Sequence, residues 1–419
     1  MTQGWKLKIL GEIAEVQSGG TPLTSRNEYW FGDIPWYSSG ELNETFTKTP
    51  KQLITPKGLE ESNAKLFPKG SLLIGMYDTA ALKMSILDRD AAFNQAIAGV
   101  KPNENIDLKF ILFAINSRRV EILNLRRGVR QKNLSLAKIK NIALPIPPLP
   151  EQKRIVAILD EAFEGIDRAI ANTEKNLANS RELFESYRNS LLTQDNEQWE
   201  ETTLGAEIDL MTGFPFKSNG YTDSDQSIRL LRGDNIVQGA LRWDDVKKWP
   251  ESEISEYLIY QLKEDDVVLA MDRPWVKAGL KHAMISSDDL PCLLVQRTAC
   301  LRGNKNINNR FLMYLIGSHS FTQHILSNQT GIGVPHISGK QIQSFKFLKP
   351  SLSEQNFISN NLDELRSKSQ RLETIYRQKI SALNELKQSI LQKAFTGELT
   401  ADNANQVKKT AKEVEVNAA

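Results

Sequence analysis

The residues LPIPPLPEQKRIVAILDE (144–161) join a proline-rich stretch directly to a segment with helical character, and FLKPSLSEQNFISNNLDE (347–364) repeats the design. Proline restricts the backbone ahead of a helix, and the helix dipole stabilises an acidic residue in the first turn, so both stretches predict a helix start. Eight residues recur 203 positions later: Pro147, Leu149, Glu151, Gln152, Ile155, Leu159, Asp160 and Glu161 match Pro350, Leu352, Glu354, Gln355, Ile358, Leu362, Asp363 and Glu364.

The duplication extends over most of the chain. Near the N-terminus the matching residues are 194 positions apart: Trp5/Trp199, Leu10/Leu204, Gly11/Gly205, Gly19/Gly213 and Ile34/Ile228. In the middle they are 201 positions apart: Gln95/Gln296, Phe110/Phe311 and Ser117/Ser318. A changing offset indicates a shared framework whose loops differ in length. Because repeats of a solenoid are only about 20–50 residues long, this pattern predicts a duplicated domain pair.

Each copy contains a mixed part followed by a long helix. Short apolar runs such as SLLIGM (71–76) and DVVLAM (266–271) predict strands, and the segments 109–124 and 310–326 predict a helix in each copy. After each proline-rich stretch, apolar and small residues recur in steps of four and three, which predicts a coiled-coil seam. The seam positions are Ile155, Leu159, Ala162, Ile166, Ala169, Thr173, Asn176, Ser180, Leu183, Tyr187 and Ser190, and then Ile358, Leu362, Leu365, Ser369, Leu372, Tyr376, Lys379, Leu383, Leu386, Ile390 and Lys393.

The predicted fold is α+β and tandem-duplicated, with two globular domains separated by two long antiparallel coiled-coil helices and related by a pseudo-twofold axis. The predicted domains are 1–150, a helix over 151–196, a second domain over 197–350 and a helix over 351–400. The polar tail 401–419 lacks aromatic residues and is expected to be weakly ordered.

The composition of the 419-residue chain is that of a globular protein, with 40% hydrophobic and 25% charged residues. No apolar run reaches the roughly 20 residues needed to span a bilayer, and the N-terminus lacks the apolar core of a signal peptide. The two cysteines, Cys292 and Cys300, have no partners at zinc-ligand spacing. We therefore expect a cytoplasmic protein without a structural metal.

The sequence argues against catalysis by this chain. TGIGVP (330–335) lacks the third glycine of a dinucleotide-binding loop. Glu151 and Lys153 invite a nuclease interpretation, but Asn356 replaces the lysine in the second copy. No Asn-Pro-Pro-Tyr or Asp-Pro-Pro-Tyr stretch typical of amino-methyltransferases occurs, and none with Phe in the last position. No catalytic residues are predicted.

The polar loops instead suggest contact with DNA. The net charge is only +2, but residues 117–140 hold eight basic residues and one acidic residue. A solvated helix face is the ordinary explanation of such a run; Gly128 and Asn133 interrupt this one and favour phosphate contact. The loops that follow the two strand-like runs, together with 126–135 and 329–338, combine glycine with Arg, Lys, Gln, Asn and His, which can read base edges in a groove. Ordinary turn chemistry is the alternative for any single residue.

The chain resembles the specificity (S) subunits of type I restriction–modification enzymes. The resemblance is carried by GVRQKNLSLAKIKNIALPIPPLPEQKRIVAILDE (128–161), its echo at 333–364, TGFPFKSNGY and IRLLRGDNI within 212–236, and ILQKAFTGEL (390–399). It implies two target-recognition domains that each read half of a bipartite double-stranded DNA target, and helices that set the unread spacer. Two methyltransferase (M) subunits with S-adenosylmethionine and two restriction/translocase (R) subunits with ATP and Mg²⁺ would bind the S subunit and supply the chemistry.

We predict DNA-binding residues from loop placement and side-chain type. In the first domain they are Arg126, Arg127, Arg130, Gln131, Lys132 and Asn133. In the second they are Arg229, Arg232, Arg273, Lys277, Lys281 and His336. Two alternatives to the S-subunit function stay open: a stand-alone sequence-specific DNA-binding protein, and a coiled-coil scaffold that binds proteins and ignores DNA sequence.

Overall fold

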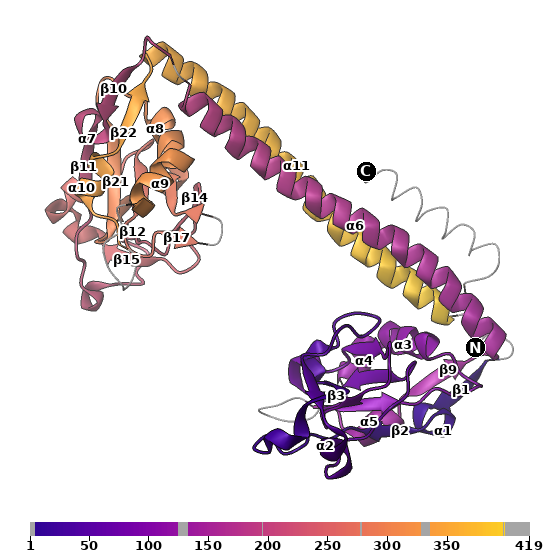
Figure 1. The fold of residues 1–419 in the computed structure, drawn as a ribbon. Helices are drawn as coiled ribbons and strands as arrows, with labels where there is room; N and C mark the ends of the chain where they lie inside the picture. The colour runs from indigo at the N-terminus through magenta and orange to yellow at the C-terminus, as the bar shows by residue number, and fades with distance from the viewer. Residues whose placement is uncertain are drawn as a thin grey trace. The chain divides into compact units, whose positions relative to one another are not determined.

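The computed structural model describes residues 5–124, 133–194, 196–276, 279–327, 336–396 and 398 (Figure 1). The chain divides into two compact units. Unit 1 contains residues 1–175 and 376–419, and unit 2 contains residues 176–375. Each unit therefore combines one globular domain with parts of two long helices, α6 (Leu149–Leu192) and α11 (Leu352–Thr396).

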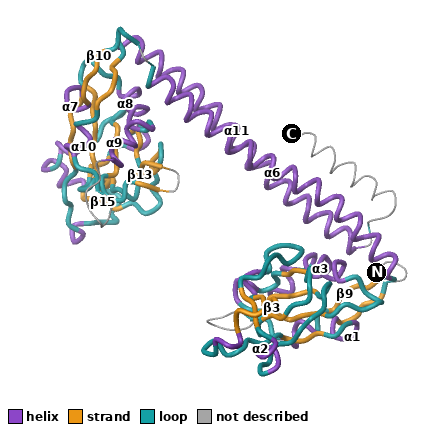
Figure 2. The backbone as a smooth tube through the Cα atoms, in the orientation of Figure 1, coloured by secondary structure: helices purple, strands orange, loops and turns teal. Residues whose placement is uncertain are grey.

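The described residues of the unit 1 domain form three small sheets and five short α-helices. Figure 2 shows the helices and strands of this domain. The sheets, in spatial order, are β1 (Lys6–Ile9) with β9 (Ala143–Ile146); β2 (Val16–Ser18), β8 (Ile97–Val100), β5 (Leu72–Gly75) and β6 (Met84–Ile86); and β4 (Gln52–Ile54), β3 (Trp30–Tyr37) and β7 (Ala92–Phe93). The helices are α1 (Leu10–Ile13), α2 (Pro56–Glu60), α3 (Leu108–Ser117), α4 (Arg119–Asn124) and α5 (Leu136–Lys140).

The domain of unit 2 repeats this order of elements. Its corresponding sheets are β10 (Glu200–Thr203) with β22 (Lys346–Lys349); β11 (Ile208–Thr212), β21 (Thr298–Gly303), β16 (Val267–Ala270) and β19 (His282–Met284); and β15 (Lys247–Pro250), β12 (Ser227–Leu231) and β20 (Cys292–Leu294). Two further hairpins are β13 (Ile236–Val237) with β14 (Ala240–Leu241) and β17 (Trp275–Val276) with β18 (Gly279–Leu280). The helices are α7 (Leu204–Glu207), α8 (Asn309–Ile316), α9 (His319–Ser327) and α10 (Gly339–Gln343). The predicted duplication is thus present in the topology, including one parallel strand pair per copy, β3 with β7 and β12 with β20.

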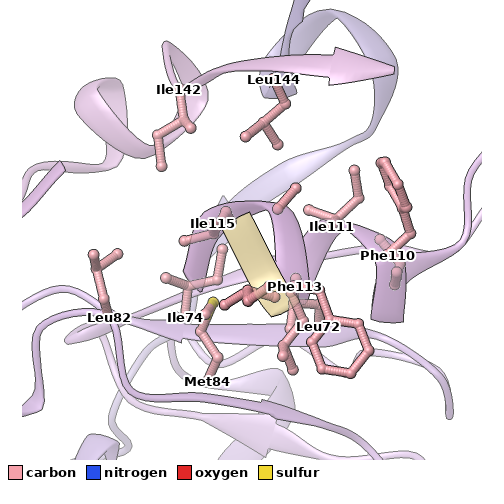
Figure 3. Packing of buried hydrophobic residues seen from close by; sticks show 14 of the residues in the cluster. Leu72, Ile74, Leu82, Met84, Phe110, Ile111, Phe113, Ile115, Ile142 and Leu144 are labelled. Atoms are coloured by element: carbon pink, nitrogen blue, oxygen red, sulfur yellow. The ribbon is translucent and has the colours of Figure 1, made fainter. Parts of the chain in front are cut away.

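The core of unit 1 forms where α3 packs on the four-stranded sheet (Figure 3). Leu72 and Ile74 of β5 contribute buried side chains, and Phe110, Ile111 and Ile115 of α3 do the same. All five are fully buried, which is the environment in which apolar side chains contribute most to stability. This packing fixes the end of β5, and with it the loop that follows.

The predicted helical stretches 109–124 and 310–326 are helical in the structure, and each is divided into two helices. In unit 2, α8 ends at Ile316 and α9 begins at His319. The Ser318 hydroxyl accepts a hydrogen bond from the Phe321 amide at 3.2 Å, which starts a new helix.

The seam of the long helices follows the predicted spacing only over part of its length. The positions from Ile155 to Thr173 are buried. Beyond them, the predicted seam residues Leu183 and Tyr187 are 64% and 41% exposed, and Phe184 and Arg188 face inward instead. A straight helix has 3.6 residues per turn, so a stripe spaced at 3.5 drifts around the helix and the contact face moves by one residue. Leu372 of α11 is also exposed, at 41%.

Within each unit, segments of α6 and α11 run antiparallel to one another (Figures 1 and 2). In unit 1, Lys387 pairs with Asp167 at 2.6 Å. In unit 2, Arg181 pairs with Glu373 at 2.6 Å, and Ser369 donates to the Ser180 carbonyl at 3.2 Å. Most of these polar contacts are partly exposed, so the buried apolar positions carry the larger share of the pairing energy.

The repeated glutamine explains why both copies share the same helix start. The Gln152 carboxamide is buried; it accepts a hydrogen bond from the Asp107 amide at 2.9 Å and donates to the Pro147 carbonyl at 2.9 Å. Asp107 in turn caps α3 by accepting from the Lys109 and Phe110 amides. Each long helix is therefore joined to the N-terminus of the helix that carries the domain core.

Candidate nucleic-acid interface

In both units the structure brings two of the predicted polar loops together. The Leu134 amide donates to the Met76 carbonyl at 2.8 Å, and the Ile337 amide donates to the Met271 carbonyl at 2.7 Å. Each bond joins the end of one polar loop to the residue that follows β5 or β16. The segments after the apolar runs therefore lie beside Asn133 in unit 1 and His336 in unit 2.

A cluster of polar side chains occupies this position in unit 2. His336 Nδ1 lies 2.5 Å from one carboxylate oxygen of Asp272, and Arg297 lies 3.0 Å from the other. The side chains of His336 and Arg297 are 53% and 70% exposed, whereas that of Asp272 is 26% exposed. Asp272 thus orients two exposed hydrogen-bonding groups, which keep further donors for phosphates or base edges.

The backbone at this cluster is unusual. Arg273 and Arg297 both have positive φ, at 44° and 66°, a conformation that non-glycine residues seldom adopt. Strained backbone is common at binding sites, where the surrounding fold holds it in place. The Met271 amide donates to the Arg297 carbonyl at 2.9 Å, which ties the second of these residues to the end of β16.

Three of the predicted residues, Arg232, Arg273 and Lys281, interact with Asp234 or with one another. Arg232 lies 3.4 Å from the Asp234 carboxylate, and the charges of Asp234 and Arg273 both act on Lys281. Lys281 is only 7% exposed, and burial lowers the pKa of its ammonium. It adds positive potential from below the surface, while Arg232 and Arg273 are the more accessible cations.

Arg229 is placed differently from the other predicted residues. Its guanidinium donates to the carbonyls of Asp288 and Leu290 at 2.7 and 3.1 Å, and lies 4.8 Å from the centre of the Trp243 ring. These contacts give it a structural role on β12, and its part in DNA binding stays a prediction. Lys277 lies outside the described residues.

In unit 1, most of the predicted residues lie outside the described part of the chain: Arg126, Arg127, Arg130, Gln131 and Lys132. Asn133 is described and is partly buried, where the loop meets the end of β5. Two further cations of the basic run have structural partners. Arg118 donates to the Ala143 carbonyl and Arg119 donates to the Leu82 carbonyl, so the basic run is not uniformly available to DNA.

Several polar residues near these loops were not predicted from the sequence. In unit 1, a cavity of about 560 Å³ is lined by Gln95, Asn63, Lys65 and residues 18–21. Thr21 donates to the Gln95 carboxamide at 2.6 Å. In unit 2, Arg242 acts on Lys281, and Arg297 belongs to the Asp272 cluster. The glutamine that recurs as Gln95 and Gln296 could have indicated these positions from the sequence. Both side chains are exposed beside the strand ends.

The part of the chain that the structure describes contains no group of three or more His, Cys, Asp or Glu side chains arranged to hold a metal ion. Both cysteines are buried, and burial raises the pKa of the Cys292 thiol to about 12. A thiol of this kind is unreactive near neutral pH. No helix among the described residues is long and apolar enough to cross a membrane.

Comparison with known proteins identifies the family. Residues 2–178 and 196–382 each match the type I restriction modification DNA specificity domain. This chain is a member of that family. The two matched segments together cover most of the chain and coincide with the two copies of the repeat.

Individual specificity subunits match the chain over different lengths. The EcoAI specificity subunit of Escherichia coli is 41% identical over 170 residues, which are 40% of this chain and 28% of that subunit. The MjaVIII specificity subunit of Methanocaldococcus jannaschii is 22% identical over 417 residues, which are 96% of this chain and 95% of that subunit.

Solved structures with the same fold cover nearly all of this chain. A chain from a type I R-M system has a TM-score of 0.77 at 17% identity, covering 94% of this chain and 98% of that one. The HsdS subunit from Thermoanaerobacter tengcongensis has a TM-score of 0.55 at 17% identity, covering 95% and 98%. At these identities the likeness establishes the fold.

Proposed function

We propose that this chain is the specificity subunit of a type I restriction–modification complex and that the domain of each unit reads one half of a bipartite DNA target. The observation that carries the proposal is a duplicated hydrogen bond: Leu134 and Ile337, at the ends of the predicted polar loops, bond to the residues that follow β5 and β16. The framework is the same in both copies, whereas the side chains presented there differ. An asymmetric two-part target requires two recognition domains on one framework that present different side chains to the DNA.

We propose further that the long helices bind the methyltransferase subunits. Support comes from apolar side chains that face solvent in the described structure of unit 2: Leu183, Tyr187, Leu372 and Ile375, each more than 40% exposed. Exposed apolar residues on a helix pair favour a protein partner. The M subunits would bring S-adenosylmethionine for adenine N6 methylation, and R subunits would bring ATP and Mg²⁺ for translocation and cleavage.

The function is tested by sequencing the methylome of the host with the gene intact and deleted. We expect deletion to remove N6-methyladenine from one interrupted, two-part motif and from no other. The motif would identify both half-sites at once. An unchanged methylome, with a functional M subunit expressed, would refute the assignment. The alternatives have their own signatures: a stand-alone binder recognises a defined duplex without M subunits, and a scaffold binds M subunits without sequence preference.

The basic loop of unit 1 gives a second prediction. Changing Arg126, Arg127 and Arg130 to alanine is expected to reduce the slope of log K against log salt for DNA binding by about 2 to 3, since each phosphate contact contributes about 0.9. The slope is measured by fluorescence anisotropy with the target duplex and the M-containing complex.

The matched control for this prediction removes the same charge elsewhere, at Lys368, Arg371 and Arg377, which are exposed on α11. We expect its slope to equal that of the wild type. Equal slopes for all three proteins would mean that the loop arginines do not meet phosphates.

A further inference from the structure

Unit 2 contains a cavity of about 650 Å³ between its helical segments and its domain. Arg188 of α6 and Arg366 of α11 line one side of it. Trp275 of β17, His282 of β19 and Tyr314 of α8 line the other. A volume of this size is typical of sites for small molecules.

Arg188 is the most unusual group in this cavity. Its side chain is 7% exposed, and its only described ion pair is with Glu185 of the same helix. Its Nε atom is buried without a hydrogen-bond partner among the described residues, and so is the indole nitrogen of Trp275. Burial lowers the pKa of Arg188, which shows that its charge is poorly solvated. Two buried donors that lack acceptors favour a ligand that supplies oxygen atoms.

The other described polar groups of the cavity supply no acceptor to Arg188 Nε or to the indole nitrogen of Trp275. His282 Nδ1 lies 2.9 Å from the Leu280 carbonyl and donates to it, and burial lowers the pKa of His282 to about 4, so the ring is neutral at physiological pH. Arg366 donates to the Gly239 carbonyl at 2.5 Å, and the Tyr314 hydroxyl donates to Asp363 at 2.5 Å. The Arg366 guanidinium adds a second positive charge to the cavity.

Unit 1 does not have these groups at the equivalent positions. The residues at the positions of Arg188 and Arg366 are Leu391 and Phe163, at the offset of 203. The position of Gly317 is taken by Asn116, at the offset of 201. A Cβ atom at Gly317 would lie 2.7 Å from His282 Nε2 and 3.2 Å from Arg188 Nη1, so the glycine is what leaves room for this pair. The shared fold therefore does not require the arginines, and another function must account for them.

We propose that this cavity is a binding site for a small anion that carries a phosphate or carboxylate group. The oxyanion lies against Arg188 and the indole N–H of Trp275, and the aromatic rings of the wall contact the remainder of the molecule. A duplex backbone cannot reach a guanidinium this deeply buried, so the ligand is distinct from the DNA target. The site adds a small-molecule ligand to a chain whose proposed function needs only DNA and protein partners.

The test is titration calorimetry of the full chain with inorganic phosphate, adenosine monophosphate and citrate. Wild type is expected to bind at least one of these probes with a Kd below about 1 mM, and Arg188→Leu is expected to weaken that binding at least about tenfold. Arg188→Leu introduces the residue found at the equivalent position of unit 1, Leu391, so we expect the variant to fold. Arg371→Leu makes the same chemical change at an exposed position of α11 and is expected to bind like wild type.

A second variant, Gly317→Asn, places the side chain found at the equivalent position of unit 1 against His282 and Arg188, and should also abolish binding. The proposal is overturned if Arg188→Leu binds the probes as tightly as wild type, or if wild type binds none of them. It is also overturned if the target duplex competes with the probe, because the site would then belong to the DNA interface. No probe binding, together with weaker binding of M subunits by Arg188→Leu, would assign the arginine to a protein contact instead.

Discussion

Deleting residues 173–179 from α6 together with residues 373–379 from α11 is expected to move methylation to a target whose spacer is about three base pairs shorter. Seven residues are two helical turns and span about 10.5 Å, and successive base pairs are about 3.4 Å apart. Removing a whole heptad from both strands keeps the phase of the flanking seam positions. It also retains the partners Asp167 with Lys387 and Ser180 with Ser369. The half-sites themselves should not change.

The control deletes residues 173–179 alone. Because the helical segments pair antiparallel in each unit, a deletion in one helix puts the remaining seam out of register, and we expect methylation to fall at the original and at the shortened target. Methylome sequencing reads out both variants. If the paired deletion methylates the original motif as well as wild type does, the helices do not set the spacer.

Replacing Gln355 by leucine is expected to lower the free energy of unfolding of unit 2 by about 3 kcal/mol. The Gln355 carboxamide is fully buried; it accepts from the Asn308 amide at 2.8 Å and donates to the carbonyls of Asn306 and Pro350 at 3.0 and 2.9 Å. Leucine fills a similar volume but leaves one buried N–H without an acceptor and two carbonyls without donors. Urea unfolding, with hydrogen exchange over residues 304–312 to follow unit 2, measures the effect.

Two variants make this experiment specific. Gln152→Leu removes the equivalent bonds in unit 1 and should destabilise that unit by a similar amount. Gln378→Leu changes an exposed residue of α11 and should have an effect below about 0.5 kcal/mol. If Gln355→Leu is no less stable than Gln378→Leu, the repeated glutamine does not join the helix to the domain.

The sequence alone predicted the duplication, the strands that lie directly before Met76 and Met271, and the two long helices. These features are local or repeated, so patterns of spacing reveal them. The same information identified the loops that the fold brings together, and it predicted Arg232, Arg273 and His336 as DNA-binding residues, which stays a prediction. Residues 125–132, which carry most of the prediction for unit 1, lie outside the described structure.

Other features depended on the tertiary structure. Leu183, Tyr187 and Leu372 have the spacing of a seam but face solvent, because the contact face of a straight helix drifts away from a strict heptad pattern. Arg242 and Arg297 are far from His336 in sequence, and only the packing of the strands places their charges beside the predicted residues. Lys281 and Arg188 are ordinary cations in the sequence. What distinguishes them is burial, and burial is a property of the neighbours that surround a residue in space, which spacing along a chain does not specify.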